Sequence, residues 1–567
     1  MTDPSSIRPP PPPASSRPQM LGQGAGARGN KKRPQPEVRA IATDDAPVSD
    51  WASLFGDLAR PIPHGELDTN PVEWRIHDKT HIEFAIDYPK GASNAAHVWE
   101  AYFFVPESFR LHETTYTKKA LYDDLQSYVR FAVPELPFRE LAKDDDGSCL
   151  HELKLALEGA TNSVDNDSEA AKEAMRAVRL VACLVRASGL VAMREIEAEV
   201  ARETADIARV RSLVFAFIVT CGSFARALRC TLKAAEAKGL PENVVVAMHW
   251  ADEDISLAIE ALCADLAVKL EQHAQIDLAL PDLAERVASR AVEEARHRLD
   301  VGYNSVGSAT ATSREVEHLE FRRHVLKRFT SSVLWLSLEV RDAAAWVLHA
   351  FYGVAAGLAM ALAFVASFGT SSFSDHFFRY AMLVAVSYAI KDRTKAFLQT
   401  AASKWIEKRY PDRLWTLRDR ERRKDVGTAR ERAGFVAFRK LPTDVLEMRR
   451  LTREHLVEEQ ARPERVIWHQ KEVTLAKDEA KETSARFPML TEIFRLNVAH
   501  WLSHTDDPNR KVVFADPTDA SIYSATARRV YNINVVYRLR REGGQGDWHR
   551  IRVVVSRKGI ERIDAIR

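Results

Sequence analysis

The chain has 567 residues, of which 46% are hydrophobic and 28% are charged, and its formal net charge is +2. This length and composition provide enough material for two or three packed domains. The five cysteines lie at irregular spacings without a CxxC pair, which excludes an evident zinc or disulfide framework and agrees with a reducing cytoplasm.

Residues 1–50 predict a disordered tail. They are rich in Pro, Ser and Gly and lack the apolar segment of a secretory signal. The run from Pro9 to Pro13 favours polyproline II, which can dock on aromatic grooves. The alternative is a tail that only keeps the protein soluble.

Residues 51–145 predict a small α+β domain. Residues 72–88 alternate apolar and polar side chains, and residues 97–109 supply a partner, so we expect an antiparallel pair. Residues 117–131 have helical spacing. Within residues 72–88, His77 and His81 share one strand face, which raises metal binding as an alternative to ordinary histidines.

Residues 165–340 predict a helical bundle and a helix that connects it to the membrane. Residues 168–298 indicate about four helices, delimited by breaks at Gly189, at Gly239 to Pro241, and at Pro281. The apolar run 213–224 is too short to span a bilayer and fits a buried bundle helix. An interfacial or re-entrant segment is the alternative.

A capping box at Thr312 and Glu315 begins the connecting helix. Its apolar residues form a near-heptad series: Leu319, Leu326, Phe329, Val333, Leu336 and Val340. We expect this helix to enter the membrane without interruption, where it could couple bundle and membrane or form a coiled-coil seam. The alternative is that the stripe packs on its own bundle.

Residues 343–390 predict a two-helix transmembrane hairpin. Residues 343–368 contain no Asp, Glu, Lys or Arg and exceed the roughly 20 residues that a membrane-spanning helix needs. Residues 373–390 form a weaker second span that carries Arg379 near the turn, where its side chain can reach the headgroups.

The basic flanks of this hairpin predict its orientation. Lys and Arg cluster on both sides, whereas residues 369–375 between the helices contain none. We therefore expect a multi-pass inner-membrane protein with both termini in the cytoplasm. The rival is a single span, which would translocate the basic residues 391–432.

Small and polar residues in the first span predict its contacts. Gly353 and Gly357 form GxxxG and Ala361 extends the small face, which indicates close packing on the second helix or on another subunit of a homo-oligomer. His349 and Arg379 are the polar residues near the bilayer. We expect them to be interfacial anchors, with a functional role as the alternative.

Residues 391–480 predict a basic juxtamembrane region of helix and strand. Residues 404–424 are basic and aromatic, and a helix there suits anionic lipid headgroups. The alternative is a charged helix that only faces solvent. We expect no nucleic-acid partner.

Residues 485–567 predict a C-terminal α+β domain. Residues 486–502 suggest an amphipathic helix, and three strands follow. In the first strand Arg538 and Arg540 lie on a polar face, which would bind an acidic or phosphorylated partner or lipid, or simply face solvent.

His500 and His504, followed by Asp506, give a weak metal-like spacing. The sequence HWLSH lacks the Glu of HExxH, so a zinc hydrolase is not indicated. The chain shows no Walker loop, GxGxxG, GxSxG or kinase signature. We therefore assign no catalytic or cofactor-binding residue and expect no cofactor.

The segments YFFVPESF (102–109) and YTKKALYDDLQSYVRF (116–131), with the hairpin much later, resemble an uncharacterised group of two-helix bacterial inner-membrane proteins. The resemblance implies a bacterial inner-membrane setting. It implies no activity and no functional residues.

These patterns predict a multidomain α+β fold with a central helical bundle and a two-helix transmembrane hairpin. We expect a non-enzymatic inner-membrane protein whose cytoplasmic domains sense or scaffold. One alternative is an oligomeric two-helix pore or effector gated by the bundle. Another is a membrane-tethered enzyme, with a site at one of two groups: His77, His81 and Asp87, or His500, His504 and Asp506.

Overall fold

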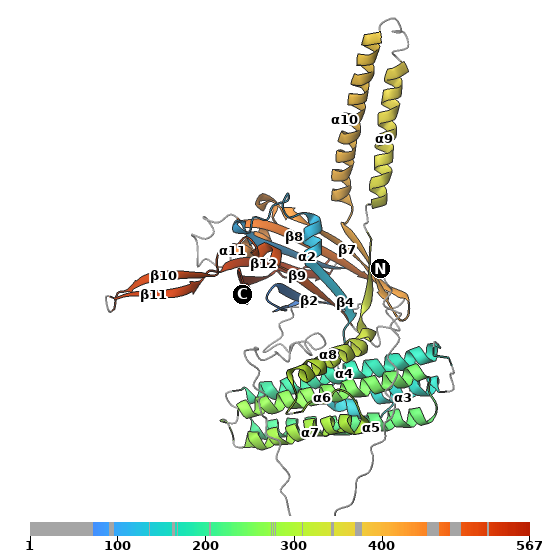
Figure 1. The fold of residues 1–567 in the computed structure, drawn as a ribbon, viewed down its shortest axis with the longest axis vertical. Helices are drawn as coiled ribbons and strands as arrows, with labels where there is room; N and C mark the ends of the chain where they lie inside the picture. Colours follow the sequence, from blue (N-terminus) through green and yellow to red (C-terminus); the bar gives the residue numbers. More distant parts are fainter. Residues whose placement is uncertain are drawn as a thin grey trace, which may run out of the picture. The chain divides into compact units, whose positions relative to one another are not determined.

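The computed structural model shows a mixed α+β protein (Figure 1). It describes residues 72–566 except for 90–95, 135, 162–164, 167, 203–205, 274, 276, 278, 309, 342–344, 369–376, 451–463, 477–488, 519–520 and 542. Within these residues lie eleven α-helices and three antiparallel sheets. The predicted tail 1–50 and the loop 369–375 fall outside the described residues.

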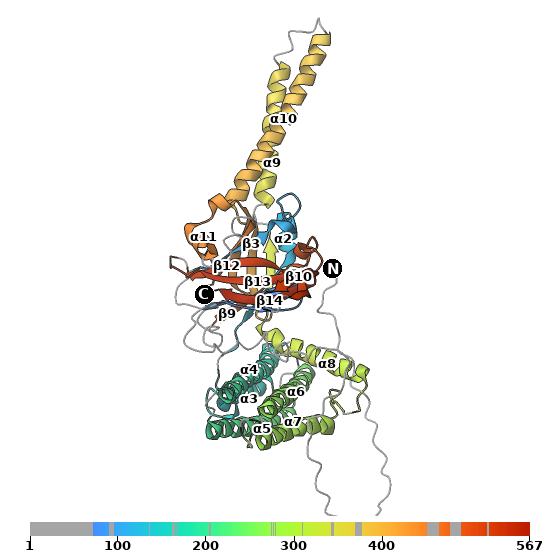
Figure 2. The ribbon, with the colours of Figure 1, turned by 90° about the vertical axis from the view of Figure 1, so that its left-hand side faces the viewer.

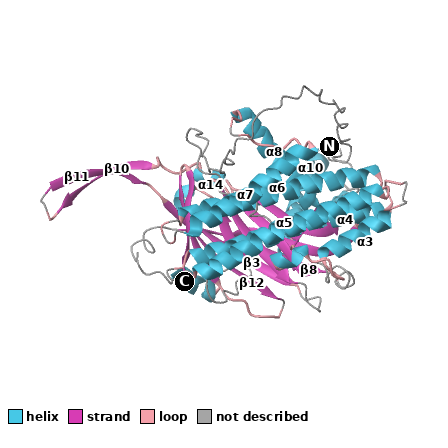
Figure 3. Cartoon of the chain, turned by 90° about the horizontal axis from the view of Figure 1, so that it is seen from below, coloured by secondary structure: helices cyan, strands magenta, loops and turns pink. Residues whose placement is uncertain are grey.

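Six helices form the bundle: α3 (Cys149–Ala160), α4 (Glu169–Val200), α5 (Ile207–Ala237), α6 (Glu242–Gln272), α7 (Ala279–Val301) and α8 (Ser313–Ser331). The side chains of Ser148, Ser168 and Asp206 accept hydrogen bonds from first-turn N–H groups and so begin α3, α4 and α5. The four helices expected over residues 168–298 are α4 to α7, which lie together in Figure 3.

One of the predicted helix breaks is wrong. Gly189 lies inside α4 because its missing side chain lets α4 approach α6, and a Cβ there would lie 2.6 Å from Leu262 Cδ1. The break at Gly239, with φ +81°, does separate α5 from α6. Pro281 falls in the first turn of α7, where a proline removes no helical hydrogen bond.

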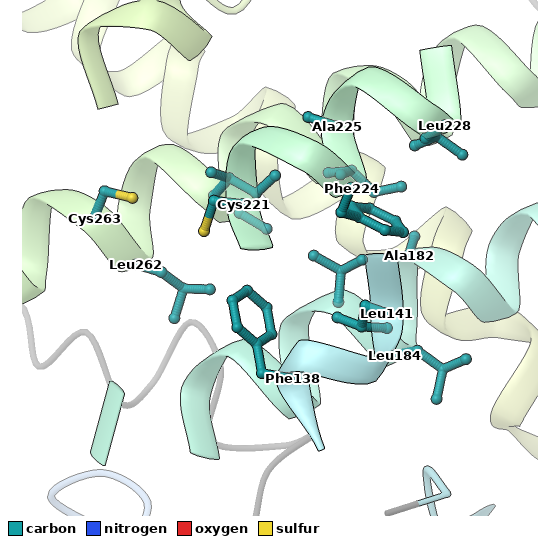
Figure 4. Packing of buried hydrophobic residues seen from close by; sticks show 14 of the residues in the cluster. Phe138, Leu141, Ala182, Leu184, Cys221, Phe224, Ala225, Leu228, Leu262 and Cys263 are labelled. Carbon is teal, nitrogen blue, oxygen red and sulfur yellow. The ribbon is translucent and has the colours of Figure 1, made fainter. Parts of the chain in front are cut away.

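The bundle has a continuous apolar core (Figure 4). Phe138, from the short helix η3 (Phe138–Ala142), stacks on Phe217 of α5 with 5.1 Å between ring centroids. Val214 of α5 is also buried, whereas Val219 on the other side of that helix is 64% exposed. The run 213–224 therefore belongs to a bundle helix with one covered side, as predicted.

Among the described residues, α5 is the one helix with the length and apolar composition to cross a membrane, and 39% of its most apolar window is buried. A shorter apolar stretch runs from His349 to Ala361. A core helix of a bundle has the same properties as α5, so this gives weak support for membrane association.

Fourteen strands form three sheets. The eight-stranded sheet has the order β14 (Gly559–Ile566), β13 (His549–Ser556), β12 (Tyr531–Arg541), β3 (His97–Pro106), β8 (Glu464–Leu475), β7 (Lys424–Val436), β6 (Arg413–Asp419), β5 (Leu336–Arg341). The four-stranded sheet has the order β1 (Val72–Ile76), β2 (His81–Pro89), β9 (Met489–Asn497), β4 (Leu125–Phe131). The third is a ribbon of β10 (Asn509–Asp516) and β11 (Ser521–Arg528).

The two larger sheets share one apolar core. Four aromatic rings mark its centre, with neighbouring centroids 5.4 to 6.5 Å apart: Phe84, Trp99, Phe494 and Tyr537. Two of these rings come from each sheet, so the sheets are held together by burial of their facing sides.

The predicted N-terminal strand pair is wrong. Residues 72–88 form the hairpin β1–β2, and β3 pairs with β12 and β8 rather than with β2. The turn lies at residues 77–80, where Asp78 accepts hydrogen bonds from the N–H groups of Thr80 and His81. Polar alternation continued through this turn and concealed it from the sequence pattern.

Two predicted helices are wholly or partly strands. Residues 117–131 begin with α2 (Lys118–Asp124) but continue as β4, and most of residues 486–502 is β9, followed by the short helix α14 (Ala499–Leu502). In β9 the core side is formed by alternate residues: Leu490, Glu492, Phe494 and Leu496. A period of two, set by pairing with β2 and β4, prevails over the helical pattern.

The three predicted C-terminal strands are β12, β13 and β14, which neighbour one another in Figure 2. We expected one side of β12 to face solvent. This is wrong for the middle of the strand, where Asn534 and Val536 are 3% and 0% exposed. Val536 shares a small apolar cluster with residues of α11 (Thr443–Arg450). This helix covers the side that we expected to face solvent.

The predicted uninterrupted helix from the bundle into the membrane is also wrong. α8 keeps the capping box of Thr312 and Glu315, but it ends at Ser331 and is followed by β5. Leu326 is 2% exposed and Arg322 bonds to α6, so the heptad-like stripe packs on its own bundle. Strand pairing of β5 with β6 interrupts the helix before residue 345.

Strands from three predicted regions share common sheets. β3 from residues 51–145 lies between β12 of the C-terminal region and β8 of residues 391–480. β2 likewise pairs with β9. These segments therefore cannot form separate sheets, because each supplies the hydrogen-bonding neighbours of another.

Candidate functional site

The candidate site is the helical hairpin inserted between two paired strands of the large sheet. The chain leaves β5, forms α9 (Ala345–Phe368) and α10 (Phe377–Arg409), and returns as β6. Arg341 at the end of β5 pairs with Leu414 near the start of β6. The two ends of the insertion are therefore neighbours in one sheet.

The two helices of the hairpin pack side by side (Figure 1). Tyr352 OH lies 3.0 Å from Ser403 Oγ, and the rings of Phe351 and Trp405 are 5.7 Å apart. These contacts join the start of α9 to the end of α10, so the helices are antiparallel.

Small residues face both into and away from this pair. Ala355 and Ala359 are 4% and 1% exposed, whereas Gly353, Gly357 and Ala361 are exposed. A Cβ added at either glycine would meet no atom within 4 Å. The side of α9 that packs on α10 is therefore the one with Ala355 and Ala359. The side with Gly353 and Gly357, for which we predicted a helix partner, has none among the described residues.

The polar residues predicted near the bilayer lie at different places. His349 is exposed in the first part of α9. Arg379 is the third residue of α10, and its side chain lies outside the described residues.

In the first half of α10, a row of exposed apolar residues is followed by charged ones. Exposed apolar residues recur every four positions: Phe378, Met382, Val386 and Ile390. Lys391 and Asp392 follow directly and form an ion pair of 3.9 Å. This change from apolar to charged is typical of the boundary between hydrocarbon and headgroups.

The predicted basic helix over residues 404–424 is only partly correct. α10 ends at Arg409, and β6 begins at Arg413. The end of α10 is fixed to the sheet, since Arg432 donates to the carbonyl oxygen of Arg409 at 3.1 Å. Asp412 accepts from Tyr122 OH at 2.9 Å, which ties the junction to α2.

The predicted metal candidates His500, His504 and Asp506 do not converge. His500 stacks on Tyr116 with ring centroids 5.5 Å apart, and Asp506 binds Arg529 at 2.5 Å. Because α14 ends at Leu502, His504 is not one helical turn from His500. In the described part of the chain, no group of three or more His, Cys, Asp or Glu side chains could hold a metal.

The second candidate group consists of His77, His81 and Asp87, and each has its own partner. His77 lies 3.5 Å from Glu83, and His81 lies 2.9 Å from Asp78. Thr491 donates to Asp87 at 2.7 Å. These ion pairs and hydrogen bonds account for the three side chains without a shared ligand.

A buried polar cluster between the two sheets was not predicted from the sequence. Glu492 of β9 accepts hydrogen bonds from Tyr88 OH, at 2.7 Å, and also from Lys471 and Ser127. Glu492 and Lys471 are 0% and 1% exposed. Four strands thus contribute to one ion pair inside the apolar core.

A second acid of this cluster lies close by. Glu431 accepts from His469 Nε2 and from Trp415 Nε1, each at 2.8 Å. Burial alone would raise its pKa, but the His469 bond, the charge of Lys471 and the Trp415 bond together lower the pKa to about 2. Glu431 is therefore ionised at neutral pH.

This cluster has the residue types of an acid–base site but no access to solvent. His469 and Ser127 complete a set in which Lys471, Glu492 and Glu431 are at most 2% exposed. Side chains buried to this degree cannot meet a substrate. The cluster instead fixes the relative position of the strands, since a buried charge must keep its partner.

The bundle contains three consecutive buried acids on α6. Asp252 binds Arg229 of α5 at 3.0 Å, and Glu253 binds Arg322 of α8 at 2.6 Å. Asp254 binds Arg186 of α4 and accepts from Thr330 at 2.7 Å. Three acids in succession, which occupy every side of one helical turn, are the sequence signal that could have revealed this network.

Two of the cysteines meet in the bundle core (Figure 4). A hydrogen bond with Cys221 and burial raise the pKa of Cys263 well above its ordinary value. The Cys263 thiol is therefore protonated at neutral pH and is a poor nucleophile or metal ligand.

No family model, curated protein or solved structure matches this chain. The resemblance of residues 102–109 and 116–131 to a group of inner-membrane proteins thus gains no support from these comparisons. The function has to be argued from the geometry.

Proposed function

We propose that this chain is a non-enzymatic inner-membrane protein. Its α9–α10 hairpin anchors the bundle and the sheets on the cytoplasmic side, where they sense or scaffold. The observation that carries this proposal is the pairing of Arg341 with Leu414 at the two ends of the insertion.

The strand pairing supports a hairpin over a single span. Paired strands lie on the same side of any membrane, so a chain that enters through α9 has to return through α10. The Lys and Arg residues beside both helices favour the cytoplasmic side. The 24 residues of α9 correspond to about 36 Å of helix, which suits a full crossing.

The charges on α10 support a headgroup level near residues 391–395. Arg393 and Lys395 are exposed, and their long side chains can reach toward anionic lipid from a helix without charged residues between Tyr380 and Ile390. We therefore include anionic phospholipid among the partners of the hairpin.

The test is replacement of residues 343–410 by a four-residue loop with Asn–Gly at its centre. The wild type should resist carbonate extraction from membranes, and the variant should become a soluble protein with a cooperative thermal transition, because β5 and β6 can then close as an ordinary hairpin. The same loop inserted after Gly543, in an exposed turn, is the control and should stay with the membrane. Extraction of the wild type by carbonate would refute the proposal.

The second candidate function is an oligomeric pore gated by the bundle. The observation that favours it is the open side of α9 at Gly353 and Gly357, where another hairpin could approach closely. Ion flux through protein reconstituted in bilayers would support it. A chain that is strictly monomeric in detergent would exclude it.

A further inference from the structure

The ribbon β10–β11 is an unusual element, because its strands pair only with each other among the described residues (Figure 1). An isolated two-stranded ribbon is marginally stable in water. Its large apolar side chains are nevertheless exposed: Val512 by 39%, Val513 by 60% and Phe514 by 51%. Such an element is typical of a surface that is completed by a partner.

The free edge of β10 determines what kind of partner fits. β11 occupies one edge through eight residue pairs, from Asn509 with Arg528 to Asp516 with Ser521. The other edge has no strand beside it in the described chain. Unpaired N–H and C=O groups along such an edge are a template for another strand.

The sequence of β10 is complementary to itself when it is read in the antiparallel direction. Centring the pair on Val513 sets Val513 opposite its own copy and Val512 opposite Phe514. It also sets Arg510 opposite Asp516 at both ends. The same register therefore satisfies apolar contact in the middle and charge complementarity at each end.

In a single copy of the chain, the charge of Arg510 is available for this pairing. Arg510 is exposed and has no ion pair among the described residues, so its guanidinium is available. A two-fold axis through Val513 would use it twice, as an isologous interface requires.

We propose that β10 pairs antiparallel with β10 of a second copy of this chain, which joins two ribbons into a four-stranded sheet. The interface lies outside the hairpin and does not depend on the proposed membrane anchoring. It makes the protein a two-fold symmetric dimer.

The first experiment is disulfide trapping of the full chain in detergent at the symmetry axis. In Val513→Cys, the two introduced thiols lie directly opposite each other and should form a dimer-specific cross-link under mild oxidation. Ile522→Cys is the matched control, since it is 77% exposed on the other strand and should not cross-link. Equal cross-linking of both variants would overturn the proposal.

The second experiment is charge reversal, measured as molar mass in detergent by light scattering. Arg510→Asp and Asp516→Arg should each convert the dimer to monomer, because each places like charges opposite each other at both ends. The double variant should restore the dimer. A dimer that survives both single variants, or a wild type that is already monomeric, would disprove this interface.

Membrane extraction separates this inference from the proposed function. Charge-reversal variants that remain carbonate-resistant but become monomeric would support both proposals. A wild-type dimer that carbonate extracts would support the ribbon interface and refute the anchor.

Discussion

The ion pair of Lys471 and Glu492 belongs to a buried polar cluster that the apolar core of the two sheets encloses. Both side chains are nearly inaccessible to solvent, and Ser127 and Tyr88 supply the remaining hydrogen bonds. The net contribution of such a pair is small, because desolvation offsets most of the attraction. Loss of one partner is costly, because the other charge stays buried and unpaired.

Lys471→Met should therefore destabilise the protein by about 3 to 5 kcal/mol, since it leaves the Glu492 carboxylate buried without its cationic partner. The measurement is the thermal or denaturant midpoint in detergent. Lys238→Met is the matched control, because the Lys238–Glu158 pair is more than half exposed and should contribute less than about 1 kcal/mol. Equal effects of the two substitutions would contradict this interpretation.

Glu431 makes the free energy of unfolding depend on pH in the acidic range. Its pKa is lowered from 4.5 to about 2 in the folded protein, so its contribution is complete above pH 4.5 and is lost as pH falls toward 2. The full loss is on the order of 3 kcal/mol. Glu431→Gln should flatten the stability curve between pH 4.5 and 2, and an unchanged acid slope in this variant would show that other carboxylates dominate.

Helix α8 shows how a polar contact can fix an element that has little apolar burial. Only Leu326, Thr330 and Ser331 are buried along its 19 residues. It is joined to α6 by Arg322, which binds Glu253 through two hydrogen bonds of 3.0 and 2.6 Å, and by Thr330, which donates to Asp254 at 2.7 Å. This helix leads directly to β5 and so connects the bundle to the hairpin.

Arg322→Ala should release α8 before the other helices, because Glu253 is only 1% exposed and would lose its partner. We expect a destabilisation of about 3 kcal/mol and faster hydrogen exchange in residues 313–331. Arg314→Ala, an exposed position on the same helix, should change stability by less than about 0.5 kcal/mol. Unchanged exchange in α8 would show that apolar contacts suffice.

At the scale of the whole molecule, the pairing of β5 with β6 constrains the membrane topology that we propose. The register of β5 on β6 keeps the segments before and after the hairpin together. The bundle precedes this point in the chain, and the last strands of the sheets follow it. All of them should therefore lie on one side.

Topology reporters test this expectation. A fluorescent-protein fusion after residue 567 should be active in the cytoplasm, and an alkaline phosphatase fusion within residues 369–375 should be active outside it. Fluorescence at the C-terminus with phosphatase activity at the loop is the pattern of two spans. An active phosphatase fusion at the C-terminus would instead indicate a single span and contradict the paired strands.

Elements whose patterns are local could be predicted from the sequence. The capping box at Thr312 and Glu315, the bundle helices and the three C-terminal strands follow from spacing and turn chemistry within a few residues. The apolar length of residues 343–368 is likewise a property of the segment alone.

Features that depend on residues far apart in the sequence could not be predicted in this way. β9 is a strand because β2 and β4 flank it, and Gly189 continues a helix because Leu262 packs against it. Lys471 and Glu492 become an ion pair only when two sheets meet. Local propensity contributes tenths of a kcal/mol per residue, so pairing and burial decide these cases. For the same reason the apolar helix at residue 345 was evident in the sequence, while its origin between two paired strands was not.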